Sequence, residues 1–150
     1  NIWLKNMEKK KKKLLDTNVV VRFLAEDDPL LAQKAKRIFL EAQEDELIIP
    51  DFVLTEIVWV LLSFYQLDKK TVIEKLEAML AFDKFSLPRK VLRQAIDFWR
   101  NENISFVDAY LLSLSFNQER KLCSFDKRLK KLAGEKLLPQ KHTSEKNGEI

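Results

Sequence analysis

The chain has 150 residues, 46% of them hydrophobic, and a formal net charge of +4, as expected for one folded domain that tolerates a polyanionic partner. Its only glycines, Gly134 and Gly148, exclude glycine-rich phosphate loops, and a single histidine, His142, argues against histidine-dependent hydrolases and His-based zinc sites. The lone Cys123 excludes an internal disulfide and fits a cytoplasmic location, and no apolar run is long enough to span a bilayer, so no membrane association is expected.

Apolar runs and helix-start residues predict strands and helices that alternate along the chain. The strands are expected at residues 12–16, 46–50, 84–87, 121–125 and 136–138. The helices are expected at residues 17–25, 28–42, 51–65, 68–80, 88–99, 105–119 and 126–132. This alternation predicts an α/β fold, with a parallel sheet covered by helices on both faces. We expect one domain at 9–139, between a disordered leader at 1–8 and a disordered polar tail at 140–150.

Four acidic residues stand next to predicted core segments. Asp16 and Asp126 directly follow predicted strands, whereas Glu56 and Asp108 lie in early turns of apolar helices. The carboxyl ends of parallel strands and the starts of the following helices share one edge of a sheet, so we expect the four carboxylates to converge. Neighbouring carboxylates stay ionised together only around a cation, and hard oxygen ligands favour magnesium or manganese over zinc. The pattern therefore predicts a divalent-metal site.

Each of these acids also has a purely structural interpretation. Asp16 and Asp126 stand where a carboxylate caps a helix, and Ser105 with Asp108 matches the Ser-x-x-Asp capping box. Glu56 could pair with a lysine, although a carboxylate inside the apolar run 52–62 is the hardest of the four to explain in this way.

Several basic, aromatic and sulfur-containing residues were assigned from their surroundings. Arg22 is compatible with either a surface position or an RNA-phosphate contact, and the run Lys9–Lys13 is interpreted as a solvated lead-in rather than a phosphate contact. Trp59, Trp99 and Cys123 are interpreted as packing residues. Apolar residues in excess of one sheet face predict a self-association surface, with the candidates Phe39, Trp59, Leu62 and Phe64.

Four segments, in order along the chain, resemble the motifs of PIN-domain ribonucleases of the VapC toxin type. They are Leu14–Leu24 followed by Asp27–Pro29, then Pro50–Leu61, Ile104–Ala109 and Cys123–Asp126. The resemblance covers about residues 12–138. It implies a three-layer fold with a five-stranded parallel sheet, and an endoribonuclease that depends on Mg²⁺ or Mn²⁺ and hydrolyses RNA with a metal-activated water. It also implies a homodimer and a cognate VapB-like antitoxin.

The resemblance assigns roles residue by residue. It implies that the metal is held, and catalysis carried out, by Asp16, Glu56, Asp108 and Asp126. The polar residues expected to support this site are Thr17, Asn18, Ser105 and Ser124. Many relatives have an acid where this chain has Ser105, so a second metal ion is expected to bind weakly or not at all.

Two other classes of function make different demands on the sequence. A PIN-like domain that has lost catalysis would act as an RNA-binding or assembly module, and retention of all four acids argues against it. A phospho-acceptor signalling domain would need paired acids directly after the first strand, and Asp27 and Asp28 lie too far into the next segment for that role.

Overall fold

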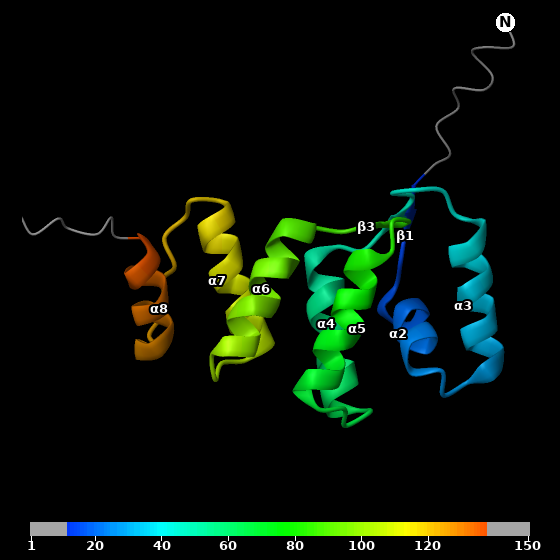
Figure 1. The fold of residues 1–150 in the computed structure, drawn as a ribbon, viewed down its shortest axis with the longest axis horizontal. Coiled ribbons are helices and arrows are strands. Elements are labelled where there is room, and N and C mark those ends of the chain that lie inside the picture. Colours follow the sequence, from blue (N-terminus) through cyan, green and yellow to red (C-terminus); the bar gives the residue numbers. More distant parts are fainter. Residues whose placement is uncertain (1–11, 138–150) are drawn as a thin grey trace, which may run out of the picture.

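The computed structural model describes residues 12–137, as a small parallel sheet flanked by helices (Figure 1). The strands are β1 (Lys13–Leu14), β2 (Leu47–Ile48) and β3 (Phe85–Ser86). The helices are α2 (Thr17–Ala25), α3 (Pro29–Glu41), α4 (Asp51–Ser63), α5 (Lys69–Ala81), α6 (Arg89–Asn101), α7 (Phe106–Asn117) and α8 (Lys127–Leu137). The predicted leader at 1–8 and tail at 140–150 lie outside the described residues.

The sheet is parallel and has the strand order β1-β2-β3. Lys13 pairs with Leu47, and Leu47 pairs with Phe85, so the three strands run in register. The helices that follow these strands, α2, α4 and α6, begin at the carboxyl edge, as the alternating pattern predicted. Figure 1 shows the sheet between α3 on one side and α4 and α5 on the other, with α6, α7 and α8 extending away along the long axis.

The expected five strands are wrong for the described residues, which contain three. Residues 121–125 form no strand, and Cys123 and Phe125 are exposed, so the interpretation of Cys123 as a core residue is also wrong. Of the segment predicted as a fifth strand, residues 136 and 137 continue α8. The reason is helical spacing: Leu129 and Ala133 are buried at i and i+4, which favours extending a helix through this region.

An aromatic cluster joins the sheet to the helices beside it. The Phe39 ring of α3 lies 4.9 Å from Phe23 of α2 and 5.2 Å from Phe85 of β3, in edge-to-face contacts. Phe82 packs against Phe85 with a ring separation of 4.7 Å. Such contacts stabilise beyond the area they bury. They attach α2 and α3 to the sheet, and α2 begins at the carboxyl edge because it directly follows β1.

The predicted self-association surface needs correction. Phe39 is only 2% exposed because it belongs to the aromatic cluster, and Leu62 packs against the core. Trp59, on α4, is 64% exposed, and Phe64, directly after α4, is 72% exposed. The interpretation of Trp59 as a packing residue is therefore wrong, whereas Trp99 is buried as expected. Within residues 12–137, no helix combines the length and apolar character needed to cross a membrane.

Lysine and arginine side chains satisfy carbonyl groups at helix ends. The Lys75 ammonium group donates to the Leu24 carbonyl at the end of α2 at 2.9 Å, and Lys84 donates to Leu40 at the end of α3 at 2.9 Å. Terminal helix carbonyls lack intrahelical donors, and glycine caps are scarce in a chain with two glycines. Long basic side chains therefore supply the missing donors.

Candidate active site

The candidate site begins where β1 ends. Asp16 occupies the N-cap position of α2, yet its side chain makes no capping hydrogen bond, so the structural interpretation as a cap does not account for it. The next residue, Thr17, is 3% exposed, and its hydroxyl group donates to Oε2 of Glu56 at 3.0 Å. This hydrogen bond joins the carboxyl end of β1 to α4 across 39 residues of sequence.

Glu56 lies on the solvent side of α4, which corrects the assumption that its carboxylate is buried. The apolar residues around it in the sequence divide between two faces, because helical geometry turns Val53, Leu54 and Ile57 inward. On the outward face, Phe52 is 72% exposed. No lysine pairs with Glu56 among the described residues, and its partner is the Thr17 hydroxyl group.

Asp108 lies in the first turn of α7 and is half-buried. The Ser105 hydroxyl oxygen accepts a hydrogen bond from the Asp108 backbone amide at 3.1 Å, so Ser105 is a helix cap. The Asp108 carboxylate has no hydrogen-bond or ion-pair partner among the described residues. The capping interpretation therefore explains why a serine occupies position 105, but it gives the Asp108 carboxylate no structural role.

A hydrogen bond that the sequence did not predict connects α7 to α4. The buried Tyr110 hydroxyl group donates to the Asp51 carboxylate. Burial, followed by this hydrogen bond, raises the pKa of Tyr110 well above its ordinary value, so the hydroxyl group stays a donor. Asp51 is the first residue of α4 and follows Pro50, which occupies the N-cap position.

Asp126 is a helix cap in this structure. Its Oδ1 accepts a hydrogen bond from the Leu129 backbone amide at 3.0 Å, and its own amide donates to the Ser124 hydroxyl oxygen at 3.0 Å. Ser124 thus supports the turn that precedes α8. Figure 1 shows α8, the helix that Asp126 caps, at the opposite end of the long axis from α2 and α3.

Among the residues that the structure describes, no three or more Asp, Glu, His or Cys side chains are placed to hold a metal ion together. Asp16 and Glu56 share one edge, next to Thr17, whereas Asp108 and Asp126 do not complete a ligand set with them. In this conformation the side chains do not fit a four-carboxylate metal centre. The assignment of the four acids as metal ligands stays a prediction.

Arg22, the basic residue on α2 near the candidate site, already has partners within the protein. The Arg22 guanidinium group donates to Oδ2 of Asp27 at 2.8 Å, and Tyr65 donates to the same oxygen at 2.8 Å. The Tyr65 hydrogen bond, together with Arg22, lowers the pKa of Asp27, and its partnership with Asp27 raises the pKa of Arg22. An arginine held in this way is poorly available to RNA.

The end of the lysine run lies at the opposite edge of the sheet. Lys12 pairs with Asp45 at 2.9 Å, and Lys13 lies 3.9 Å from the buried carboxylate of Glu46. These contacts give Lys12 and Lys13 structural partners, and the interpretation of the whole run as a solvated lead-in stays a prediction. Lys9, Lys10 and Lys11 lie outside the described residues.

A groove of about 230 Å³ opens between α2 and α3, beside the candidate site. We call it the α2–α3 groove, and its lining residues are Asn18, Val19, Arg22, Leu31, Lys34, Ala35 and Ile38. Asn18 connects it to the site, because it directly follows Thr17. Its walls are mostly apolar, and Lys34 provides a cation at its rim.

Comparison with known proteins agrees with this architecture. The sequence model of the PIN domain matches residues 13–135. The chain belongs to the PIN domain family. A VapC ribonuclease from Aquifex aeolicus (strain VF5) is 28% identical over 125 residues, which cover 80% of this chain and 91% of the relative. No solved structure matches the chain.

Family membership confirms the resemblance drawn from the four motifs and the α/β fold class. All four acids lie within the part of this PIN domain that the family model matches. Sequence reasoning missed Tyr110 and Lys34. Tyr110 lies in an apolar helix, where a hydroxyl group that needs a buried partner was a usable signal. Nothing in the local sequence distinguishes Lys34 from other surface lysines.

Proposed function

We propose that this PIN-domain protein is an endoribonuclease that depends on a divalent metal ion, magnesium or manganese, and is the toxin of a toxin–antitoxin pair. The observation that carries the proposal is the Thr17–Glu56 hydrogen bond at the carboxyl edge of the sheet, beside an Asp16 carboxylate that caps nothing. It links Glu56 to Thr17, the residue that follows Asp16, in a chain of the PIN domain family that is similar to a VapC ribonuclease.

The proposed metal-binding and catalytic residues are Asp16, Glu56, Asp108 and Asp126; to hold one ion together, Asp108 and Asp126 would have to move toward Asp16 and Glu56, because the described side chains do not form such a set. A divalent ion bound to carboxylates supplies a more acidic water and neutralises charge on a phosphate. The chain's own contribution is positional. Thr17 holds the Glu56 carboxylate at the sheet edge, and the Tyr110–Asp51 hydrogen bond holds the start of α7, which bears Asp108, against α4.

Incubation with total RNA and with tRNA, followed by mapping of the new RNA ends, tests the proposed activity. We expect defined cleavage by the wild type with manganese or magnesium and none in excess chelator. Asp16→Asn and Asp108→Asn should abolish cleavage while helical circular dichroism persists, because the amide keeps the shape and loses the charge. Cleavage by either variant at the wild-type rate would remove that residue from the proposed site.

A second candidate function is an RNA-binding or assembly module without catalysis. The observation in its favour is that the described carboxylates do not form a set of three or more around one point. The same experiment separates the two functions. RNA that is bound and stays intact with either metal ion would favour the second candidate.

The proposed partners follow from the toxin assignment. We propose a VapB-like antitoxin that places a basic side chain beside Asp16 and Glu56, and a homodimer formed through the exposed aromatic side chains Phe52, Trp59 and Phe64. We also propose that the protein acts in the cytoplasm. Sedimentation at micromolar concentration tests the dimer: Trp59→Ser should dissociate it, and a monomeric wild type would contradict it.

A further inference from the structure

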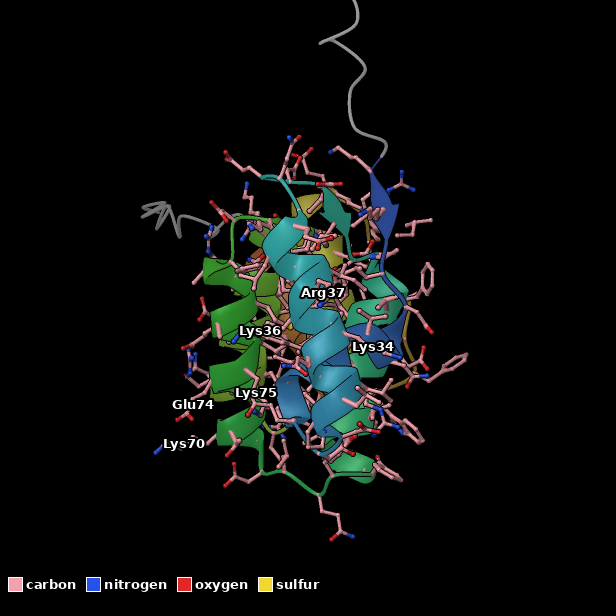
Figure 2. The ribbon with its side chains drawn as sticks, turned by 90° about the vertical axis from the view of Figure 1, so that its right-hand side faces the viewer. Lys34, Lys36, Arg37, Lys70, Glu74 and Lys75 are labelled. Carbon is pink, nitrogen blue, oxygen red and sulfur yellow. The ribbon has the colours of Figure 1, made fainter. Side chains whose placement is uncertain are left out.

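Three cations on the outward face of α3 have no counter-charge in contact with them. Lys34, Lys36 and Arg37 are exposed, and none makes a hydrogen bond or an ion pair with another described residue. Figure 2 shows the three side chains along this helix. In contrast, Arg22 is occupied by Asp27, and Lys75 and Lys84 by carbonyl groups. The basic side chains of α3 are therefore available to bind an anionic ligand.

Lys34 and Arg37 form a line that starts beside the candidate site. Lys34 is at the rim of the α2–α3 groove, which contains Asn18, the neighbour of Thr17. Lys34 and Arg37 also line a second hollow of about 580 Å³ on the outward face of α3. They are three positions apart, so they project from the same side of the helix. The two depressions both lie along α3 and have Lys34 in common.

We infer that Lys34 and Arg37 bind successive phosphates of the RNA strand that leaves the candidate site through the α2–α3 groove. This inference rests on the proposed ribonuclease function. An endonuclease cuts inside a chain, so phosphates on each side of the cut must cross the neighbouring protein surface. Cations near that path stabilise the strand by displacing its condensed counterions.

The apolar groove walls suit the same ligand. Val19, Ala35 and Ile38 offer contact area without hydrogen-bonding groups, so they accept ribose and base faces of any sequence. The carboxylate in the α3 hollow is Glu41, at its far end. Lys34 and Arg37 lie nearer the candidate site than Glu41 does. This order of charges fits an RNA strand that contacts the protein for only a short distance outside the cleavage point.

Binding of a fluorescent single-stranded RNA of about 20 nucleotides, in excess chelator, tests this inference without cleavage. The logarithm of the binding constant is measured against the logarithm of salt concentration for the wild type and Lys34→Gln/Arg37→Gln. Loss of two phosphate contacts should reduce the slope by about 1.4. Affinity at about 0.1 M salt should fall about tenfold.

Lys70→Gln/Arg93→Gln is the matched control. It also removes one lysine and one arginine from exposed helical positions, on α5 and α6, and lowers the net charge from +4 by the same two units. We expect it to bind RNA with nearly the wild-type slope. Equal slopes for Lys34→Gln/Arg37→Gln and wild type, or equal losses in both double variants, would overturn the inference.

Two further outcomes are informative. If the α3 variant binds RNA normally and loses affinity for poly-glutamate, the surface recognises an acidic protein, and the RNA assignment is wrong. If wild type fails to cleave RNA with either metal ion and the α3 variant still shows the reduced slope, the proposed enzymatic function fails and the RNA-binding surface stands.

Discussion

Replacing Thr17 with valine tests the hydrogen bond that defines the candidate site. Valine keeps the shape of the buried side chain and removes the hydroxyl group that donates to Glu56 at 3.0 Å. A hydrogen bond to a charged group is worth about 1.5–3 kcal/mol. Glu56 is exposed, so water partly replaces the lost donor, and we expect a cost near about 1 kcal/mol. For a chain of this size that corresponds to a fall in Tm of about 3 °C.

The assay combines urea unfolding, followed by circular dichroism, with RNA cleavage by the same preparations. Thr17→Val should lose about 1 kcal/mol and at least about tenfold in cleavage rate, because a freely rotating Glu56 is badly placed for the reaction. Glu56→Gln should keep most of the stability, since its amide oxygen still accepts from Thr17, and should lose cleavage. Stability and activity are thus expected to separate between the two variants.

Thr55→Val is the matched control for this prediction. Its hydroxyl group lies one residue from Glu56 and donates to the Phe52 carbonyl of its own helix at 2.9 Å. Its loss should cost under about 0.5 kcal/mol. The reasoning would be refuted if Thr17→Val cost no more than Thr55→Val, or if its cost simply added to that of Glu56→Ala, because a real contact requires coupling between its partners.

Three further predictions concern single residues. Asp126→Ala should lose about 1 kcal/mol in urea unfolding, whereas Asp126→Asn, which still caps α8, should lose little; loss of cleavage in Asp126→Asn would show that the charge matters beyond the cap. The pKa of Asp27 is held below its ordinary value of 3.8 by hydrogen bonds from Tyr65 and then from Arg22, so these contacts stabilise above that pH and are lost as pH falls through the folded-state pKa. Asp27→Asn should therefore be less stable than wild type at pH 7 (urea unfolding), and the deficit should shrink as the pH is lowered into the acid range; a deficit that stays constant with pH would contradict this origin. Glu26 has left-handed backbone angles (φ 52°, ψ 26°), so Glu26→Gly should raise stability by about 0.5 kcal/mol in thermal melts, and a lower Tm would show that its side chain contributes more than the relieved strain.

Much of the secondary structure was predictable because its causes are local. The helix expected at 17–25 coincides with α2, and the one expected at 51–65 differs from α4 only at its end. Helical periodicity and capping residues depend on neighbours within a few positions. The parallel arrangement followed from the alternation of strands and helices, and the exclusion of histidine and glycine-loop chemistry followed from composition.

The candidate site was predictable only in its residue types. The chain order and spacing of Asp16, Glu56, Asp108 and Asp126 pointed to carboxylate chemistry, and the family match agrees with the motifs that contain them. Their distances from one another were not predictable, because each lies on a separate element. Asp126 stands before α8, and no strand among the described residues leads into that helix, so its position relative to Asp16 depends on helix packing and not on a shared sheet edge.

The sequence by itself determined the helices, three of the expected parallel strands and the residue types of the candidate site, since these depend on composition and on residues close together in the chain. Tertiary structure alone decided that Glu56 faces solvent and meets Thr17, that Tyr110 binds Asp51, and that residues 121–125 pair with no strand. Those outcomes join segments 39 or 59 residues apart, or leave them unpaired. They depend on how whole helices pack, and packing is set by the summed burial of many side chains rather than by any one stretch of sequence.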